Sequence, residues 1–430
     1  MNIKKLYHHL KQSTNLLTMK SFLICCWILA SAASAGCAQT STKINVPSNN
    51  EADRIVPAAE RMDQYLPLLK GKKVAVFANH TSVAGNSNLV DTLVKRGVNI
   101  TVIFGPEHGF RGTADAGEKI DNVTDPATGI AVISLYGKKR KPAAEDLKNV
   151  DVMLFDIQDV GVRFYTYISS LEEYMESAVE NNKPVIILDR PNPNGFYIDG
   201  PVLDPAFKSF VGMQPVPIVY GMTIGEYAKM LAGEKWLTPD AKGASNTRQI
   251  DLTVIPCENY THKSKYILPV KPSPNLPEIQ SIYLYPSTCF FEGTVLSEGR
   301  GTDHPFQLFG HPLLPKNLAS FTPRSKEGAK NPKLLNQVCY GWDLRGTPDE
   351  TLKKIDNRIQ LKWLIDAYNL FPQKDSFFLK NNFINLLAGN NVLARQIKEG
   401  KSEEDIRKSW EPALSEFKKT RKKYLIYQDF

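Results

Sequence analysis

Short apolar segments that alternate with helical ones most restrict how this chain of 430 residues can fold. Segments of five or six residues, rich in Val, Ile, Leu and Phe, predict buried strands at 73–78, 100–104, 131–135, 151–155 and 184–188. Helical periodicity over 88–96 and 170–181 falls between them. Buried strands joined by helices usually pair in parallel and are covered on both faces. The sequence therefore predicts an α/β fold with a Rossmann-like, mostly parallel sheet.

A proline-rich stretch after this α/β region indicates a second domain. Four prolines within 269–277 stiffen the chain there. We expect a Rossmann-like catalytic domain at 55–272 and a smaller α+β domain at 273–430 that closes an active-site cleft. Within the smaller domain the sequence predicts two helices and one exposed polar segment, at 349–367, 403–419 and 313–334 respectively.

The first residues read as a targeting segment. The apolar run 22–33 is too short to span a bilayer and is typical of a signal peptide. The sequence 34–37 (SAGC) is similar to a lipoprotein cleavage site, although 33–35 (ASA) would also suit an ordinary signal peptidase. We expect a signal peptide at 1–37, a flexible tether at 38–54, and an exported protein in the periplasm or at the cell surface. A lipid on Cys37 would be its only membrane attachment.

Several classes of function are disfavoured by the sequence. No G-x-G-x-x-G follows the first strand, so no dinucleotide cofactor is expected. No His-x-His, H-E-x-x-H or G-x-S-x-G occurs, so we predict neither a metal nor a nucleophilic serine. The formal net charge is +8, but Lys and Arg are spread along the chain and no nucleic-acid-binding module is present. We therefore expect no cofactor, no metal and no nucleic-acid partner.

Titratable and polar residues follow nearly every predicted strand. In open α/β sheets the ligand binds outside the carboxyl ends of the strands, so these residues should converge on one edge. They are Asn79 and His80, Glu107 and His108, Tyr136, Asp156 and Asp159, and Asp189 with Arg190. Glu107 and His108 lie in the glycine-rich loop 105–112, where the backbone can approach a ligand closely. We expect this loop to form the centre of an active site.

A second glycine-rich loop, 292–302, carries Glu292, Glu298 and Arg300. Paired carboxylates are the groups that glycoside hydrolysis needs. Nearby aromatic residues would stack on sugar rings or pack in the core; they are Phe110, Tyr136, Phe164, Tyr165 and Tyr167. Arginines near these carboxylates would bind an anionic ligand or neutralise the carboxylates; they are Arg111, Arg163, Arg190 and Arg300.

Eight motifs together resemble the NamZ (YbbC-like) family of bacterial exo-β-N-acetylmuramidases. They are GPEHGFRG (105–112), DAGE (115–118), SLYG (134–137), FDIQDVGVRFYTY (155–167), LDRPNP (188–193), GMTIGE (221–226), PSPN (272–275) and EGTVLSEGRGT (292–302). The resemblance covers 73–306 closely and the rest of the chain more loosely. It implies a Rossmann-like domain, a smaller second domain and an active site in the cleft between them. One departure is His80, where the family pattern has Gln.

The resemblance implies an exo-acting hydrolase that releases N-acetylmuramic acid from the non-reducing end of peptidoglycan fragments, with Glu107 as catalytic acid. Our candidate catalytic residues are Glu107, His108, Asp156 and Glu298. Our candidate substrate-binding residues are Asn79, Arg111, Tyr136, Asp159, Arg163, Tyr165, Asp189, Arg190, Asn192, Glu292 and Arg300. Arg300, then Arg163, is expected to bind the lactyl carboxylate of the sugar. The alternatives are a non-catalytic cell-wall-binding lipoprotein and a metal-dependent hydrolase.

Overall fold

The computed structural model describes residues 53–112, 122–237 and 249–430. The predicted signal peptide, Cys37 and nearly all of the predicted tether lie outside these residues, as does the motif at 115–118. None of the helices within the described ranges is long and apolar enough to cross a membrane.

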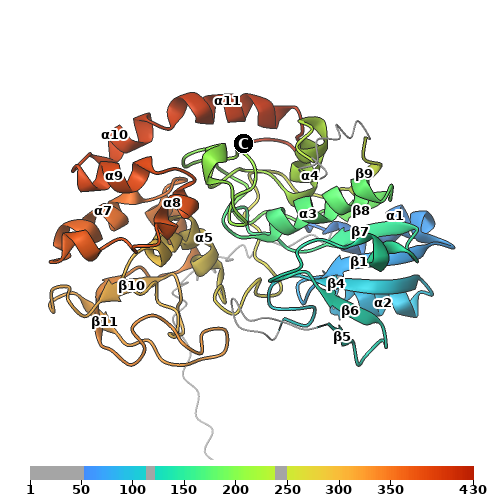
Figure 1. Cartoon of the computed structure of the whole chain (residues 1–430), viewed down its shortest axis with the longest axis horizontal. Helices are drawn as coiled ribbons and strands as arrows, with labels where there is room; N and C mark the ends of the chain where they lie inside the picture. Colours follow the sequence, from blue (N-terminus) through green and yellow to red (C-terminus); the bar gives the residue numbers. More distant parts are fainter. Residues whose placement is uncertain (1–52, 113–121, 238–248) are drawn as a thin grey trace, which may run out of the picture. The chain divides into compact units, whose positions relative to one another are not determined.

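A seven-stranded sheet forms the larger domain, at the right of Figure 1. Its spatial order is β5 (Val123–Thr124), β6 (Ala131–Ser134), β4 (Asn99–Gly105), β1 (Lys73–Ala78), β7 (Val152–Asp156), β8 (Val185–Leu188) and β9 (Leu252–Ile255). Only β5 runs antiparallel to its neighbour. The six parallel strands follow the doubly wound order 3-2-1-4-5-6. The predicted Rossmann-like sheet is confirmed.

Both faces of this sheet are buried, as near-continuous apolar strands require. Side chains alternate along β1, so that Ala75 and Phe77 join one core and Val74 and Val76 join the other. Helices α3 (Tyr167–Glu180) and α4 (Ile224–Gly233) pack in the first core. Helices α1 (Met62–Leu69) and α2 (Leu89–Lys95) pack in the second.

Polar caps fix where these helices begin. The Asn88 side chain accepts a hydrogen bond from the Val90 amide and starts α2. Thr223 and Glu226 form the capping box that starts α4. A short hairpin, β2 (Val83–Ala84) with β3 (Ser87–Asn88), precedes α2.

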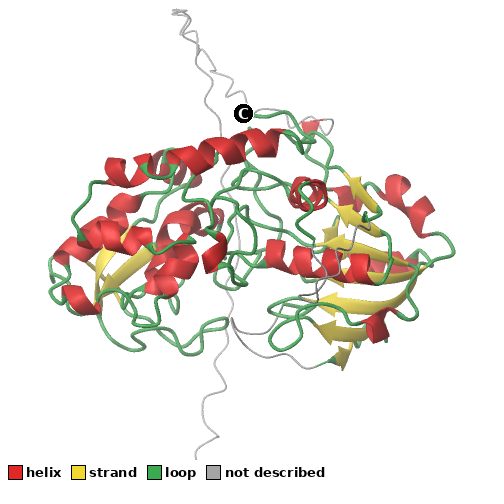
Figure 2. Ribbon diagram, turned by 45° about the horizontal axis from the view of Figure 1, so that its top comes forward, coloured by secondary structure: helices red, strands yellow, loops and turns green. Residues whose placement is uncertain are grey.

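The smaller domain contains a three-stranded antiparallel sheet, at the left of Figure 1. Its order is β10 (Leu308–His311), β12 (Cys339–Asp343) and β11 (Ala319–Phe321). The surrounding helices are α5 (Ile279–Thr288), α6 (Pro348–Ile355), α7 (Leu361–Leu370), α8 (Phe383–Ala388), α9 (Val392–Lys398), α10 (Glu403–Lys408) and α11 (Glu411–Lys422). Figure 2 shows mainly loop between the two sheets. The exact division at 272/273 stays a prediction.

Two expected long helices are each divided. The segment 349–367 forms α6 and α7, because Asp356 and Asn357 adopt positive φ angles of 48° and 51° that end α6. The segment 403–419 forms α10 and α11, with a proline in the first turn of α11. The segment 313–334, expected to be an exposed excursion, contributes β11 to the small sheet.

The last residues of the chain pack against the larger domain. The Tyr427 hydroxyl donates to Asp189 Oδ2 (2.6 Å). The Ile426 amide donates to Glu226 Oε1 (2.8 Å). Asp189 and Glu226 are both fully buried. The C-terminal segment therefore supplies hydrogen-bond donors to carboxylates in the interior of the larger domain.

Candidate active site

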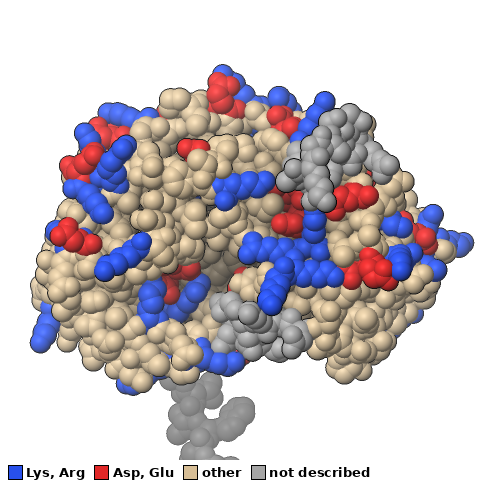
Figure 3. All heavy atoms as spheres, in the orientation of Figure 1, with Lys and Arg blue, Asp and Glu red and all other residues tan. Residues whose placement is uncertain are grey.

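A pocket with about 450 Å³ of empty space, partly open to solvent, is lined by residues from both domains. They are Glu107, His108, Phe164, Tyr165, Thr166, Tyr167, Ser273, Asn275, Leu276, Tyr285, Arg300 and Phe306. Figure 3 shows one face of the molecule hollowed near its centre, with acidic and basic side chains around the hollow.

The loop after β4 brings Glu107 and His108 to the pocket. His108 and Gly109 adopt φ angles of 67° and 75°, a conformation that is costly for His and tolerated by Gly. Burial raises the pKa of Tyr136, and the charge of Glu107 and a hydrogen bond to it raise it further. Glu107 is therefore a pocket carboxylate that interacts with a neighbouring phenol.

Two histidines join this loop to the 271–275 segment. His108 is buried, and its Nε2 lies 3.3 Å from Ser273 Oγ. His80 Nε2 lies 2.9 Å from the Lys271 carbonyl oxygen, and burial lowers the pKa of His80. A Cβ atom added at Gly112 would lie 2.3 Å from His80 Nδ1, so His80 packs directly under the loop. His80, the departure from the family motif, thus supports the loop.

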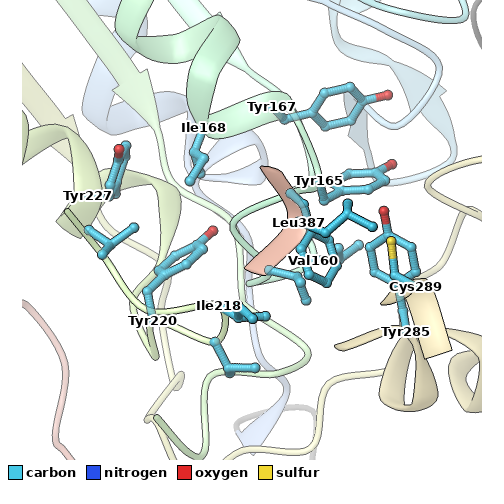
Figure 4. Packing of buried hydrophobic residues seen from close by; sticks show 14 of the residues in the cluster. Val160, Tyr165, Tyr167, Ile168, Ile218, Tyr220, Tyr227, Tyr285, Cys289 and Leu387 are labelled. Carbon is cyan, nitrogen blue, oxygen red and sulfur yellow. The ribbon is translucent and has the colours of Figure 1, made fainter. Parts of the chain in front are cut away.

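Aromatic rings from both domains form the walls of the pocket. Tyr165 packs edge to face with Tyr167, with ring centroids 4.7 Å apart, and with Tyr285 at 6.1 Å; Figure 4 shows it between these two rings. Tyr285 in turn packs edge to face on Phe306 at 4.8 Å. The Tyr165 hydroxyl donates to the Pro272 carbonyl (2.8 Å). These rings present apolar faces with fixed hydroxyl directions, which suits a sugar ring.

Charged side chains of alternating sign lie next to Arg300, on the side of the pocket that belongs to the smaller domain. Arg300, in the pocket lining, donates to Glu292 Oε1 (2.7 Å), and its Nε lies 3.7 Å from Glu298 Oε1. Lys333 Nζ lies 2.9 Å from Glu298 Oε2. The Arg300 guanidinium also lies over the Phe306 ring, 5.2 Å from its centroid. We call Glu292, Glu298, Arg300 and Lys333 the loop cluster.

The two carboxylates of the loop cluster differ in their electrostatics. Burial raises the pKa of Glu292; the charge of Arg300 opposes this rise, and the charges of Glu298 and Glu107 add to it. Burial would also raise the pKa of Glu298, but the charges of Lys333 and Arg300 outweigh it and hold the pKa below its usual value. Glu298 is therefore the ionised member of the pair, and Glu292 takes up a proton more readily.

The structure brings several predicted site residues together. Glu107, His108, Tyr165 and Arg300 line the pocket. Tyr136 interacts with Glu107. Glu292 and Glu298 reach the site through Arg300. Glu298 is 3% exposed and lies outside the pocket lining, so the catalytic role expected for it has no direct support from its position.

The predicted site residues that directly follow β7 and β8 lie outside the pocket lining. Asp156 and Arg190 form a bidentate ion pair (2.6 and 2.8 Å), with side chains 0% and 1% exposed. Asp189 accepts hydrogen bonds from the Thr223 hydroxyl (2.7 Å) and the Gly225 amide (2.8 Å) at the start of α4. We call Asp156, Asp189 and Arg190 the strand-end cluster. Contrary to our expectation, these side chains are enclosed by protein and pair with one another or cap a helix.

Two loop residues that we expected to bind substrate are also interior. Asn192 donates to the Met222 carbonyl (2.8 Å) and is buried. Asp159 Oδ2 accepts a hydrogen bond from the Gly161 amide (2.6 Å) and another from the Tyr220 hydroxyl. Both side chains therefore hold loops in place and lie outside the pocket lining.

Two further candidates, Arg111 and Asn79, have structural partners. Arg111 pairs with Asp125 (2.8 Å) and Asp91 (3.0 Å). Asn79 is buried and donates to the Tyr167 hydroxyl (2.9 Å), so it positions a pocket residue from behind.

Arg163 is fully buried and donates to the carbonyls of Pro201, Val216 and Leu387 (2.7–3.0 Å). Burial lowers its pKa to about 9. Arg163 links the two domains and lies outside the pocket lining, which leaves Arg300 as the arginine in that lining.

Sequence reasoning assigned no role to several pocket residues. Ser273 and Asn275 lie in the PSPN motif, whose residues carry no local signal of a role in binding or catalysis. Tyr285 belongs to α5, a helix that the sequence did not predict because prolines surround it. Phe306 reaches the pocket through a φ angle of 65°, which periodicity cannot indicate. Lys333 lies in a polar segment with no motif.

Comparisons with known proteins show which family this chain resembles over its length. The family model described as exo-β-N-acetylmuramidase NamZ, N-terminal, matches residues 74–280, and its C-terminal counterpart matches 283–427. The peptidoglycan β-N-acetylmuramidase NamZ of Bacillus subtilis (strain 168) is 39% identical over 418 residues, covering 90% of this chain and 96% of the relative.

Two solved structures are also similar, and both are DUF1343-family proteins from Bacteroides fragilis NCTC 9343. The first is 46% identical with a TM-score of 0.79, and the match covers 88% of this chain and 100% of that one. The second is 28% identical with a TM-score of 0.70, and the match covers 87% of this chain and 99% of that one.

Proposed function

Since the chain belongs to the NamZ family of exo-β-N-acetylmuramidases, which are glycoside hydrolases, we propose that it releases N-acetylmuramic acid from the non-reducing end of peptidoglycan fragments. The observation that carries this proposal is one pocket that is lined by Glu107 from the larger domain and by Arg300 from the smaller one. A carboxyl group for proton transfer and a cation for an anionic sugar therefore face the same space.

Glu107 is our proposed general acid. It lines the pocket and interacts with Tyr136, which restricts the orientation of its carboxyl group. In its protonated form, Glu107 delivers a proton to the glycosidic oxygen as the bond to the anomeric carbon breaks. Glu292 is the second carboxyl group of the proposal, because it accepts a hydrogen bond from Arg300 of the pocket lining (2.7 Å) and the charge of Glu107 helps to raise its pKa.

Arg300 is our proposed ligand for the lactyl carboxylate that distinguishes N-acetylmuramic acid from N-acetylglucosamine. Arg300 lines the pocket, whereas Arg163, the other arginine considered, is fully buried. Planar guanidinium groups pair well with carboxylates. Tyr165, Tyr167 and Phe306 offer aromatic faces and hydroxyl groups to the pyranose ring.

The direct test is incubation with the disaccharide N-acetylmuramic acid–N-acetylglucosamine, with the product anomers followed by NMR. Glu107→Gln keeps the shape of the side chain and removes its proton. It should lower kcat on this disaccharide by about 10²–10⁴, the range expected for general acid–base catalysis. On an aryl glycoside, whose leaving group needs little protonation, the loss should be much smaller. Equal losses on both substrates would remove Glu107 from the role of acid.

The same assays separate the proposal from its alternatives. A non-catalytic cell-wall-binding protein would bind the disaccharide and never convert it. A metal-dependent hydrolase would lose activity on treatment with a chelator. Either result would contradict the proposed glycosidase mechanism.

We also propose that the protein is exported and anchored by a lipid on Cys37. The support is the short apolar run 22–33 followed by small residues and Cys37 in the sequence. Mass spectrometry of the membrane fraction should find a diacylglyceryl or triacylated Cys37. A soluble mature protein that begins at Gly36 would contradict this proposal.

A further inference from the structure

Lys333 reaches the active-site region from a distant part of the sequence. Its Nζ donates hydrogen bonds to the carbonyl oxygens of Phe291 (2.8 Å), Thr294 (3.2 Å) and Leu296 (2.8 Å). An ammonium group has three N–H bonds, so these three carbonyls use all of them. Lys333 thus joins three points of the chain segment that leads to Glu298.

The same ammonium group also neutralises Glu298. Its nitrogen lies 2.9 Å from Glu298 Oε2, and the Glu298 side chain is 3% exposed. The other cation near Glu298 is Arg300, whose Nε lies farther away at 3.7 Å. A carboxylate with so little access to water needs a compensating charge. Lys333 supplies that charge at the shorter distance and leaves Arg300 directed toward Glu292.

Backbone contacts hold the segment that carries Lys333 against the loop that carries Arg300. The Arg324 amide donates to the Gly301 carbonyl (2.8 Å). A Cβ atom added at Gly301 would lie 2.4 Å from the Arg324 carbonyl oxygen and 2.6 Å from Pro332 Cγ. Gly301 also has a φ angle of 79°. The two segments therefore meet without room for a side chain between them.

We propose that Lys333 is a positioning residue of the pocket: it holds and neutralises Glu298, and thereby keeps the Arg300 guanidinium turned toward Glu292 and the substrate. The part that concerns the substrate rests on the function proposed above. Without Lys333, an ionised Glu298 would attract Arg300 away from Glu292, and the guanidinium would leave the position that lines the pocket. Charge alternation along the loop cluster is what fixes this geometry.

Lys333→Met tests the proposal by removing the charge and keeping much of the side-chain volume. KM for the disaccharide should rise about tenfold with a smaller change in kcat, because a charge-assisted contact to the substrate is misaligned. Lys316→Met, at an exposed lysine in the connection between β10 and β11, is the control and should leave both constants unchanged.

The pH profile provides a readout that a purely structural role would not change. Glu298, Arg300, Glu292, Cys289, Tyr285 and Glu107 are the titratable and charged groups coupled to this site. Removing the positive charge of Lys333 favours the protonated forms of Glu298 and Glu292, so the profile of kcat/KM should move to higher pH. Lys333→Arg, which retains the charge, should keep the wild-type profile even where its donor geometry raises KM.

A Glu298→Gln background separates charge neutralisation from tethering. If Lys333 acts through Glu298, adding Lys333→Met to Glu298→Gln should change KM less than about twofold, because the two effects are not additive. Independent, multiplying effects would overturn the proposal. So would a Lys333→Met enzyme with wild-type KM and pH profile. If Lys333→Met does not fold, Lys333→Arg decides the question, and a shifted pH profile in that variant contradicts the proposal.

Binding measurements distinguish failure of this proposal from failure of the proposed function. Titration calorimetry with N-acetylmuramic acid needs no turnover. A wild-type protein that binds this sugar without hydrolysing the disaccharide would contradict the enzymatic proposal alone, and an affinity about tenfold lower in Lys333→Met would still support the role of Lys333. Equal affinities in the two proteins would contradict the role of Lys333 whether or not the disaccharide is hydrolysed.

Discussion

The strand-end cluster and the loop cluster contain similar charged residues in very different surroundings. In the strand-end cluster, Asp156 and Arg190 are 0% and 1% exposed and satisfy each other with two hydrogen bonds. In the loop cluster, Glu292 and Arg300 are 19% and 26% exposed, although they are joined at 2.7 Å. One pair is sealed inside the domain, and the other borders a pocket.

The difference shows that a charged residue after a buried strand is not by itself evidence of a site. A sealed ion pair cannot exchange its partner for a ligand without opening the core, so its role is to fix one arrangement of the chain. A partly exposed arginine can share its donors between a carboxylate of the protein and one of the substrate. Access to the pocket, and not polarity, separates the two clusters.

Asp156→Asn is the substitution for which this comparison predicts the largest effect. It leaves the buried Arg190 without its counter-charge, so we expect a loss of about 3–5 kcal/mol in the free energy of unfolding. Urea titration would measure the loss, and kcat/KM of the remaining folded protein should stay close to that of the wild type. Asp343→Asn is the control, because its exposed pair with Arg345 should contribute less than about 1 kcal/mol.

A stable Asp156→Asn protein without activity would reverse the assignment. It would return Asp156 to the catalytic role that the sequence suggested and would place the strand-end cluster in the site.

Asp159 tests whether the buried polar groups of the larger domain all have hydrogen-bond partners. Its Oδ1 is buried, and the described part of the chain provides it with no hydrogen-bond donor. Burial raises the pKa of Asp159 to about 6, above the value near 4 of an unfolded chain. The folded state therefore binds this proton more tightly, and the resulting stability is fully present below about pH 4 and lost as the pH rises through about 6.

The expected size of this effect is about 3 kcal/mol between pH 4 and pH 7. Asp159→Asn removes the titration, so its Tm should vary less with pH over this interval than that of the wild type. Calorimetry at several pH values would measure it, with Asp251→Asn at an exposed position as control. If Asp159→Asn retains the wild-type slope, another group is responsible for the pH dependence.

Arg300→Ala gives the smallest expected effect and tests the loop cluster. Losing a charge-assisted contact costs about 1.5–3 kcal/mol, so kcat/KM on a muramyl substrate should fall about tenfold or more. An analogue with N-acetylglucosamine in place of N-acetylmuramic acid lacks the carboxylate and should be affected much less. Steady-state kinetics on both substrates would decide. Equal losses would mean that Arg300 only neutralises Glu292 and Glu298.

The parts of the fold that depend on regular periodicity could be predicted. The strands β1, β4, β6, β7 and β8 and the mostly parallel sheet that they form follow from local patterns. The division of the C-terminal helices could not be predicted in this way. Asp356 and Asn357 adopt positive φ angles that depend on tertiary packing. The helix α5 was missed because prolines precede it and one lies within it.

The candidate site was predicted where it lies in glycine-rich loops and missed where it depends on long-range contact. Glu107 and Arg300 stand in glycine-rich loops and were recognised. Asp156 carries the same local signal, yet its contact with Arg190, 34 residues away, closes it off. Lys333 has no local signal, since its role appears only when a separate segment folds back on Glu298.

The contacts made by the C-terminal segment affect the order in which the larger domain can be completed. Tyr427 follows Asp189 by 238 residues, and Ile426 follows Glu226 by 200. Ribosomes add roughly 5–20 residues per second, so each donor is made roughly ten seconds or more after the carboxylate that it serves. Until then, Asp189 and Glu226 have their partners at the start of α4 but lack these two later donors. The hydrogen bonding inside the larger domain is therefore complete only after residues 426 and 427 have been made.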